Sequence, residues 1–510
     1  MANNTQTIAR NSFWYGLELL FSLFGAFVAS VTVARVIGPE RLGYFSYMVW
    51  LTNITATVGA FGLPMTTRKY MAEYLNRGEG GMARSIYRAT FRLQVAIAVG
   101  VTAVALVLVW MLGDPSQRLV SMLLVMNMAP RMIGFIPSQA NSATESMRRN
   151  TVPALLGGVL TVSLTLIALW AGWDLPGVAA AVVAGPVLET GLKLRSVDRW
   201  LRNIVPVPIP AGLQRQMFLY SGQGLMLMLL NVVVWDRSDL VFLKWLNHDI
   251  RQVTFFSTAF NLTERVAMIP NAFGNSVGVT MMAQYGRGQE KLRALTVEST
   301  RYAFLIALPL LAGMACVSGP AILLLYGERF RPMIPVLAAV AVLAIPKVLS
   351  ASPTQLLQTT QNQGFLVIWG CICGAIDVAL DILLTPHYGA LGAALANGTA
   401  QALAAIGVWW RVYRLFDLDL RLGAFGKIAV SGLGMAATAA IIGWAVPTHA
   451  GVAASVIAGA VVWFALLRWT GALEPTDIER LRHVGNALPG RFRPGWDRLL
   501  GIVSPVPPVV

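Results

Sequence analysis

The chain has 510 residues, of which 56% are hydrophobic and 12% charged, and its mean hydropathy is +0.62. This composition leaves no room for a sizeable soluble domain and predicts a helical membrane protein. The net charge of +15 does not favour nucleic-acid binding, because the basic residues are dispersed between apolar stretches instead of being gathered in one basic domain.

Fourteen apolar stretches follow one another, each long enough to cross a hydrocarbon core, which takes about 20 helical residues. They are predicted near 12–37, 42–63, 89–112, 118–139, 151–171, 175–192, 216–235, 252–282, 301–325, 333–357, 364–386, 388–410, 424–446 and 450–469. Arg10 is the only basic residue before the first stretch, and no small-residue cleavage site follows that stretch. We therefore expect the stretch to be an anchor and not a removable signal peptide. The predicted fold class is an all-α polytopic membrane protein with about 14 transmembrane helices.

The Lys and Arg residues fall into alternate gaps between these stretches. With the N-terminus in the cytoplasm, 27 of the 39 lie in cytoplasmic segments, for example Lys427, and 8 lie on the opposite side, for example Arg331. This bias predicts a multi-pass protein of the bacterial inner membrane with both termini in the cytoplasm, its basic loops beside anionic lipid.

A weak internal repeat predicts two lobes of six helices each. The sequence Met-Ala-Glu-Tyr at 71–74, after the second span, resembles Met-Ala-Gln-Tyr at 282–285, after the eighth, and Gly177 aligns with Gly392 at a nearly equal offset. An even number of spans in each repeat gives parallel lobes, an arrangement in which transporters bind substrate at the interface between the repeats.

Five parts follow from this repeat and from the composition of the connecting segments. They are an N-lobe at 1–193 (spans one to six), a cytoplasmic inter-lobe linker at 194–215, a C-lobe at 216–411 (spans seven to twelve), spans thirteen and fourteen at 412–470, and a cytoplasmic tail at 471–510 with a short amphipathic helix. The last two spans have no counterpart in the repeat and are an addition to it.

The sequence contains no motif for a bound cofactor or metal. A Walker A loop, a zinc motif and a Gly-rich nucleotide fingerprint are all missing from it, and Cys316, Cys371 and Cys373 lack metal-site spacing. The longest periplasmic gap, about 236–251, is too short for the large loop that a glycan polymerase or ligase needs. We therefore expect a transporter and not an enzyme.

Three turns resemble motifs of one family. Val-Ile-Gly-Pro-Glu-Arg-Leu-Gly at 36–43 is similar to the LGPxxxG signature of polysaccharide-biosynthesis flippases in the multidrug/oligosaccharidyl-lipid/polysaccharide (MOP) superfamily. Tyr-Gly-Ala-Leu-Gly-Ala-Ala at 388–394, preceded by Asp-Ile-Leu-Leu-Thr-Pro at 381–386, resembles a second turn, and Tyr-Gly-Glu-Arg-Phe at 326–330 resembles a third. Their order and spacing extend the resemblance over about residues 10 to 490.

The resemblance implies a flippase that moves an undecaprenyl-diphosphate-linked oligosaccharide from the cytoplasmic to the periplasmic leaflet by alternating access. Such a protein serves exopolysaccharide, capsule or lipopolysaccharide O-antigen synthesis, and its expected partners are this substrate, membrane lipids and the polysaccharide polymerase machinery. A proton or Na⁺ gradient is the candidate energy source. A peptidoglycan-precursor flippase and a small-molecule antiporter of the same superfamily remain alternatives.

Charged residues within spans are costly and normally face a cavity or one another, so they are the candidates for function. Arg265, Arg131 and Lys347 are the cations expected to contact a diphosphate or acidic sugar, because a guanidinium binds phosphate oxygens in pairs and an ammonium attracts them as a point charge. Each has an alternative. Arg131 and Lys347 lie near span ends or proline breaks, where snorkelling or structural pairing would account for them, and Glu264 is positioned to neutralise Arg265.

Four carboxylates within spans are candidates for a coupling site or a polar cavity face: Glu18, Glu264, Asp377 and Asp381. Asp377 and Asp381 are four residues apart and share a helical face, where two carboxylates in a low dielectric would share a proton. The family usually has Asn at such positions, so a polar lining is the other interpretation of this pair. For Glu18, an interhelical hydrogen bond is the alternative.

Overall fold

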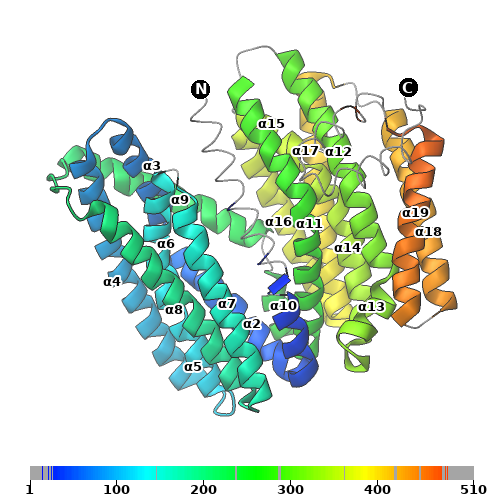
Figure 1. The fold of residues 1–510 in the computed structure, drawn as a ribbon, viewed down its shortest axis with the longest axis horizontal. Coiled ribbons are helices and arrows are strands. Elements are labelled where there is room, and N and C mark those ends of the chain that lie inside the picture. Colours follow the sequence, from blue (N-terminus) through cyan, green and yellow to red (C-terminus); the bar gives the residue numbers. More distant parts are fainter. Residues whose placement is uncertain are drawn as a thin grey trace, which may run out of the picture. The chain divides into compact units, whose positions relative to one another are not determined.

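The computed structural model describes residues 27–144, 146–235, 238–284, 289–360, 362–418, 422–446 and 449–473, together with positions 14, 21, 24, 25, 477 and 479. Within these residues the chain is helical and forms no β-strand (Figure 1). Ten of the described helices are long and apolar enough to cross a membrane, or eleven if the bent pair Pro39–Gly59 and Leu63–Asn76 is one span. The predicted all-α polytopic membrane fold is confirmed, while the number of fourteen spans stays a prediction.

The chain folds as two compact units. Unit 1 comprises Met1–Leu240 and Asp249–Thr254, and unit 2 comprises Val241–His248 and Phe255–Val510. Unit 1 contains a helix at Phe27–Ile37, α2 (Pro39–Gly59), α3 (Leu63–Asn76), α4 (Gly80–Leu112), α5 (Arg118–Met126), α6 (Met128–Ala143), α7 (Arg148–Trp170), α8 (Asp174–Leu201) and α9 (Ala211–Trp235).

Unit 2 contains the remaining helices of the chain's described part. They are α10 (Asp239–Leu246), α11 (Arg251–Gln284), α12 (Gln289–Cys316), α13 (Ser318–Leu325), the 3₁₀ turn η1 (Glu328–Phe330), α14 (Met333–Leu349), α15 (Ala351–Thr359), α16 (Gln363–Tyr388), α17 (Ala390–Phe416), α18 (Leu422–Ala445) and α19 (His449–Thr470). The first residues of α10 and the first turn of α11 are counted in unit 1.

Unit 1 is built around α6, which packs against α2, α3, α4 and α8. Met128, Met132, Ile136 and Ala140 of α6 are fully buried, and their spacing of four residues places them along one face of the helix. Gly134 lets α8 approach, since a Cβ there would lie 2.5 Å from the hydroxyl oxygen of Thr190. Small residues at a helix interface allow this close contact in membranes, where no hydrophobic force drives helices together.

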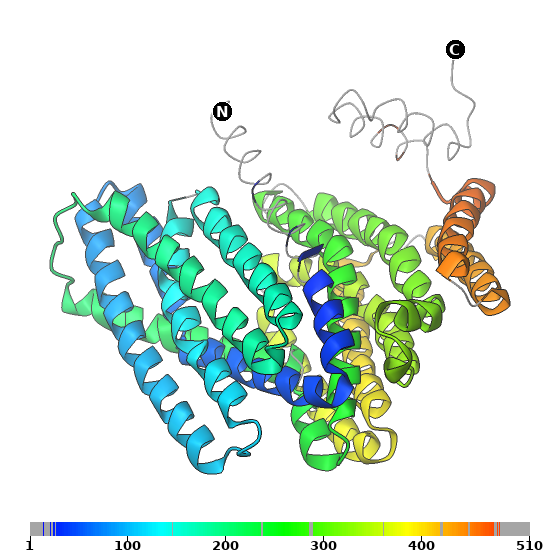
Figure 2. The ribbon, with the colours of Figure 1, turned by 60° about the horizontal axis from the view of Figure 1, so that its bottom comes forward.

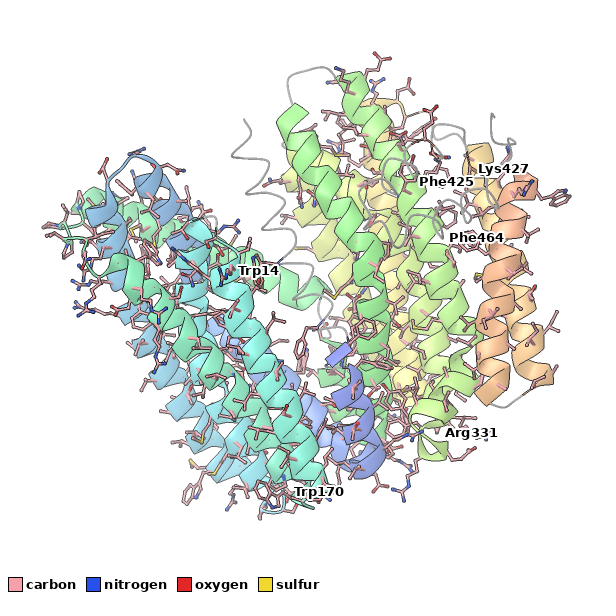
Figure 3. The ribbon with its side chains drawn as sticks, in the orientation of Figure 1. Trp14, Trp170, Arg331, Phe425, Lys427 and Phe464 are labelled. Carbon is pink, nitrogen blue, oxygen red and sulfur yellow. The ribbon has the colours of Figure 1, made fainter. Side chains whose placement is uncertain are left out.

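In unit 2, α14 packs against α12 and α17, and α18 pairs with α19 in a hairpin that contacts α12 (Figures 1 and 2). Alanines bring α11, α12 and α14 together in one buried cluster, which includes Ala267, Ala303, Ala307 and Ala344. Arg331, in the turn before α14, and Lys427, on α18, lie at opposite ends of this unit (Figure 3). Their separation agrees with the opposite sides that the charge count assigns to them, although the orientation of the termini stays a prediction.

Two of the turns that resemble the family contain glycines at positions where a side chain would be strained or would collide with a neighbour. Gly38 has φ 81°, a left-handed conformation, and a Cβ on Gly43 would lie 2.3 Å from the carbonyl oxygen of Ile250. The Thr254 hydroxyl donates to the carbonyl of Pro39 at 2.5 Å beside this contact. The start of α2 therefore lies directly against the first turn of α11 within unit 1.

The turn between α16 and α17 follows the same principle. Gly389 has φ 54°, and a Cβ on Gly392 would lie 2.4 Å from the carbonyl oxygen of Leu384. Gly177, its predicted counterpart in the repeat, is also crowded, with its virtual Cβ 2.7 Å from the Cβ of Trp173. Both turns thus use the missing side chain of glycine to let consecutive helices begin in contact.

The segment predicted as an inter-lobe linker, 194–215, is partly helical. α8 continues to Leu201, and α9, the predicted first span of the C-lobe, packs on α2 and α3 in unit 1. Between them, the guanidinium of Arg84 donates to the backbone carbonyls of Arg202 and Ile204, which fastens the connection to α4. The six-plus-six lobe boundaries themselves stay a prediction.

The tail after α19 is connected to α12 through one buried carboxylate. Asp477 is 1% exposed, forms an ion pair with Arg301 and accepts a hydrogen bond from the hydroxyl of Tyr302 at 2.5 Å. The Arg301 guanidinium also donates to the carbonyl of Ala472 at 3.4 Å. Apart from 471–473 and positions 477 and 479, the tail with its predicted amphipathic helix lies outside the described residues, as do Glu18 and the end of the second repeat motif at Tyr285.

Replacing Gly43 with Ala tests the contact between α2 and α11. The new methyl group would collide with a backbone carbonyl that cannot rotate away, so we expect a loss of stability of about 1–3 kcal/mol. The matched control is Gly100→Ala in α4, where no atom lies within 4 Å of the added Cβ. Thermal unfolding midpoints in detergent should fall for Gly43→Ala and stay level or rise for Gly100→Ala, and equal midpoints would contradict the packing described.

Candidate functional site

A charged pair lies between two apolar helices of unit 2. The ammonium Nζ of Lys347, on α14, is 2.9 Å from the carboxylate Oε1 of Glu264, on α11. The Lys347 and Glu264 side chains are 22% and 37% exposed, so neither is sealed within the protein. The ammonium also lies 6.0 Å from the ring centroid of Phe260, at the outer limit of a cation–π contact.

Lys347 lies near the end of α14 but in the middle of the candidate span Met333–Thr359, which α14 forms together with α15. Lys347 is 14 residues after the start of α14 at Met333, and Glu264 is 13 residues after the start of α11 at Arg251. At 1.5 Å per residue both positions are about 20 Å from the start of their helices, a depth that falls within a hydrocarbon core of about 30 Å if each helix starts at the membrane surface. A single charge at such depth costs about 2.5–3.5 kcal/mol on insertion scales, so opposite charges that meet there offset part of each other's cost.

Arg265 adds a second cation at the same depth. It directly follows Glu264 on α11, is partly buried, and interacts electrostatically with Tyr326 of the turn after α13. Glu264 forms an ion pair with Lys347, so its carboxylate has a cationic partner on another helix besides its sequence neighbour Arg265. Adjacent helical residues point to different faces, so Glu264 and Arg265 are directed toward different surroundings.

Polar groups follow Lys347 where α14 gives way to α15. Pro346 lies inside the end of α14, and the hydroxyl of Ser350 donates to the carbonyl of Lys347 at 2.8 Å. Ser352 is 1% exposed, and its hydroxyl has no hydrogen-bond partner among the residues that the structure describes. A broken helix with spare hydrogen-bonding groups is tolerated at membrane depth where it lines a cavity.

An apolar groove of about 470 Å³ lies in the same unit, between the α18–α19 hairpin and α12. Its walls include Met314 of α12, Met435 of α18, and Trp463 and Phe464 of α19. Figure 3 labels Phe464 on α19. Gly313 helps keep it open, because the atom nearest to a Cβ there would be the terminal methyl of Met435 at 3.7 Å. We call this the α18–α19 groove.

The α18–α19 groove and the charged residues meet at one turn of α11. Val266, which lines the groove, directly follows Arg265 and lies two residues after Glu264. One turn of α11 thus carries both a wall of the groove and two charged side chains, on different faces of the helix. This juxtaposition within unit 2 is the arrangement on which the functional proposal rests.

Arg131 belongs to unit 1 and has a neutral partner. Its guanidinium, on α6, donates to the side-chain oxygen of Asn53, on α2, and the Arg131 side chain is exposed at the helix surface. An amide oxygen orients the guanidinium and leaves its positive charge uncompensated by that contact. The role of Arg131 in substrate binding stays a prediction.

Asp377 and Asp381 share one face of α16, as the sequence predicted from their spacing, and both are fully buried. The Thr385 hydroxyl, one further turn along, donates to a carboxylate oxygen of Asp381 at 3.2 Å. One oxygen of Asp377 has no hydrogen-bond partner within the described part of the chain. The coupling role of the pair stays a prediction, and Glu18, the fourth carboxylate, lies outside the described residues.

Known structures share this fold. The chain superimposes on the lipid II flippase MurJ in an inward closed conformation with a TM-score of 0.70 at 13% identity, covering 89% of this chain and 97% of that one. It superimposes on an inward-facing multidrug-resistance MATE family transporter of the MOP superfamily with a TM-score of 0.63 at 15% identity, covering 78% of this chain and 96% of that one. The architecture is therefore that of the MOP class of membrane transporters.

The family follows from the sequence. A family model for polysaccharide biosynthesis proteins matches residues 32–335, more than half of the chain, and the chain belongs to this family. It is also similar to the succinoglycan biosynthesis transport protein ExoT of Rhizobium meliloti (strain 1021), with 21% identity over 438 residues and 83% of each chain covered. The predicted family is confirmed, and the matched residues include the turns at 36–43 and 326–330.

A double-mutant cycle measures the Lys347–Glu264 pair. Glu264→Gln and Lys347→Gln each leave one charge at membrane depth without its partner, whereas the double variant leaves none. We expect a coupling free energy of about 1–3 kcal/mol from thermal unfolding in detergent, because the pair is only partly exposed.

The exposed Glu73–Arg77 pair of α3 is the control for this cycle. The same two substitutions to Gln should couple by no more than about 0.5 kcal/mol at that water-exposed site. Strict additivity of the Glu264 and Lys347 variants would show that the two charges do not stabilise each other.

Proposed function

We propose that the protein flips a polyprenyl-diphosphate-linked oligosaccharide from the cytoplasmic to the periplasmic leaflet of the inner membrane by alternating access. Such a substrate has a hydrocarbon chain that stays in lipid, a diphosphate, and a polar glycan that must be carried across. A protein that moves it needs an apolar surface for the chain and cationic groups for the diphosphate at the same level of the membrane.

The observation that carries this proposal is the turn of α11 at 264–266. Val266 lines the α18–α19 groove, which suits the polyprenyl chain, and Arg265 lies next to it with the Lys347–Glu264 pair on the adjoining helix. Cations beside a turn that also lines an apolar groove suit a substrate in which a hydrocarbon chain joins a diphosphate.

Glu264 has a defined role in this scheme. It partners the Lys347 ammonium when no substrate is bound, so the cation is never left bare at membrane depth. A diphosphate that enters then replaces the carboxylate as the anion beside Lys347, and Arg265 adds a guanidinium that binds phosphate oxygens in pairs. Arg131 in unit 1 is the third candidate contact.

Asp377 and Asp381 are our candidates for the coupling site. Buried carboxylates on one helix face either share a proton or bind a cation, because two negative charges cannot both persist in a low dielectric. A proton or Na⁺ gradient would then supply the driving force. Glu18, which lies outside the described residues, keeps its predicted place among these candidates.

Family membership and the similarity to a succinoglycan biosynthesis transport protein support a polysaccharide precursor as the glycan. The substrate lipid, the membrane around it and the polymerase machinery that consumes it are the partners that this function requires. The same fold also serves a lipid II flippase and MATE transporters, so the experiment below includes an outcome for each.

The leaflet of the lipid-linked oligosaccharide tests the proposal directly. In a conditional deletion strain, an impermeant glycan-oxidising reagent is applied to intact spheroplasts and to inverted membrane vesicles, and the modified lipid-linked glycan is quantified. Without the protein, we expect the glycan to accumulate on the cytoplasmic face and surface polysaccharide to disappear. Lys347→Ala should lower the periplasmic fraction about tenfold or more, since a hydrogen bond to a charged group contributes about 1.5–3 kcal/mol.

The control for that variant is Lys291→Ala, which removes an exposed lysine of α12 in the same unit and should leave transport unchanged. A glycan that reaches the periplasmic face normally in the deletion strain would refute flipping of this substrate. Death of that strain with accumulated peptidoglycan precursor would identify the alternative flippase, and loss of drug efflux alone would identify an antiporter.

Filling the α18–α19 groove should block the polyprenyl chain. Gly313→Leu adds a side chain that projects toward Met435, where an added Cβ meets its nearest atom at 3.7 Å, so the groove has room for the new group at the expense of a ligand. We expect lost binding of undecaprenyl phosphate, read by native mass spectrometry, with the folded protein retained. Gly426→Leu on α18, where no atom lies within 4 Å of the added Cβ, is the control and should bind as before.

A further inference from the structure

A second cavity, of about 580 Å³, lies between α7 and α8 in unit 1. Four guanidinium groups line it, from Arg148 and Arg149 at the start of α7 and from Arg195 and Arg199 on α8, and no carboxylate is among its lining side chains. It therefore attracts anions. The proposed flipping function uses none of these residues.

Two of the four arginines have no partner among the described residues that would neutralise them. Arg195 and Arg199 are exposed and form no ion pair or hydrogen bond with any residue that the structure describes. Arg149 is oriented by the hydroxyl of Thr144 at 3.2 Å and by the ring of Trp200 at 5.8 Å, both uncharged. The positive charge of the cavity is thus uncompensated within the described part of unit 1.

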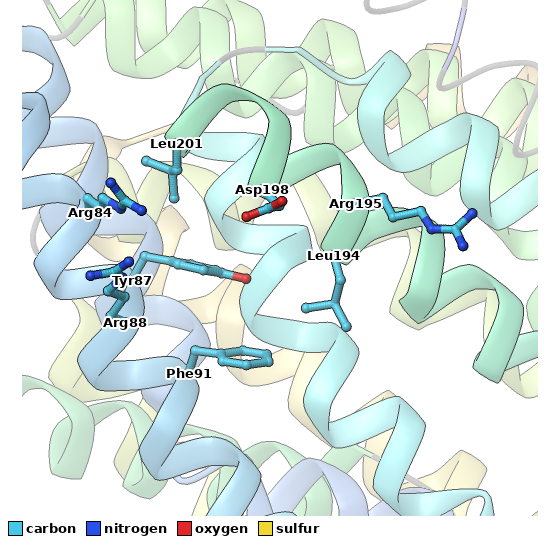
Figure 4. A pocket seen from close by; sticks show the side chains of 8 residues that line it. All are labelled: Arg84, Tyr87, Arg88, Phe91, Leu194, Arg195, Asp198 and Leu201. Atoms are coloured by element: carbon cyan, nitrogen blue, oxygen red, sulfur yellow. The ribbon is translucent and has the colours of Figure 1, made fainter. Parts of the chain in front are cut away.

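A neighbouring cavity, of about 370 Å³ between α4 and α8, shows which way Arg195 is directed. Arg84 and Arg88 reach it from α4 and Asp198 from α8 (Figure 4). The guanidinium of Arg195 points away from these three side chains (Figure 4). Asp198 therefore does not serve as its counter-ion.

One side of the α7–α8 cavity is apolar and leads onto a surface suited to lipid. Leu156 and Leu192 line the cavity, and Leu156 is 49% exposed. Further along α7, Val159 and Ile167 are exposed large apolar side chains. A ligand in this cavity thus meets cations at one end and a hydrocarbon-compatible helix face at the other, which a soluble anion does not need.

From this arrangement we propose that the α7–α8 cavity binds the phosphate headgroup of an anionic phospholipid, with the acyl chains along α7. The predicted orientation places these arginines at the cytoplasmic leaflet, whose anionic lipids are attracted to basic pockets between transmembrane helices. The site is independent of the transported substrate, so its test does not depend on the flippase proposal.

Phosphatidylglycerol binding to the full chain tests the proposal. The purified protein in detergent is titrated with phosphatidylglycerol or, separately, phosphatidylcholine, and retained lipid is counted by native mass spectrometry. The cavity variant is Arg148→Gln/Arg195→Gln/Arg199→Gln. The control variant, Arg68→Gln/Arg202→Gln/Arg215→Gln, removes the same charge from exposed arginines of unit 1 that do not line the cavity.

We expect wild type and the control variant to retain phosphatidylglycerol and not phosphatidylcholine. The cavity variant should lose roughly a hundredfold in affinity, because each basic residue near lipid contributes about 1 kcal/mol and 1.4 kcal/mol is tenfold. Unchanged elution and thermal unfolding show that a variant is folded. If the triple variant does not fold, Arg195→Gln and Arg199→Gln, which break no described contact, replace it with an expected loss of about fivefold each.

Three results would overturn the proposal. Equal phosphatidylglycerol affinity in wild type and the cavity variants would place the lipid elsewhere. Displacement of the lipid by an equimolar concentration of glycerol phosphate would define a site for free anions. Retention of undecaprenyl diphosphate with no retention of phosphatidylglycerol would make the cavity an entry site for the transported lipid.

Discussion

The ion pair of Lys347 with Glu264, about 20 Å from the start of their helices, is the contact on which the proposed site depends. A lone ammonium at this depth would oppose insertion of α14, and a lone carboxylate would oppose insertion of α11. As a pair they become tolerable, and their partial exposure keeps the cation accessible to a competing anion. Under the proposed function, stability and substrate recognition use the same two groups, so we expect a substitution at either position to alter both.

Small residues make this contact geometrically possible. Ala267, Ala303 and Ala344 let α11, α12 and α14 approach closely, so that a lysine and a glutamate on neighbouring helices reach each other. The turns also depend on small residues, because a Cβ at Gly43 or Gly392 would collide with a backbone carbonyl. The polar and apolar parts of the unit are therefore both consequences of close helix packing in a solvent that supplies no hydrophobic force between helices.

Much of this was accessible from the amino-acid sequence. Hydropathy revealed the membrane fold, the turn motifs revealed the family, and the cost of buried charge singled out Lys347, Glu264 and Arg265. The partner of Glu264 could not be predicted from the sequence. Glu264 and Lys347 are 83 residues apart, and their pairing depends on how α11 and α14 pack and rotate about their axes. The α18–α19 groove was equally hidden, because apolar residues facing a groove and apolar residues facing lipid look alike in a sequence.

The cavity between α7 and α8 could not be predicted from the sequence either. Arg195 and Arg199 counted only toward topology in the sequence, where charge bias and a binding site produce the same pattern. Their spacing of four residues placed them on one face of α8, but the arginines that complete the cavity come from the start of α7. Only the packing of the two helices shows that these charges share one space.

The burial of Asp477 has a practical consequence for anyone who shortens or tags this chain. A protein cut directly after α19 would keep the Arg301 guanidinium, 7% exposed, and lose the carboxylate that it faces. Reporter fusions that map membrane topology are commonly joined just beyond a final span. A fusion joined directly after α19 would remove Asp477 and leave Arg301 without this partner. A fusion placed after position 479 preserves the pair and reports on a chain whose α12 is intact.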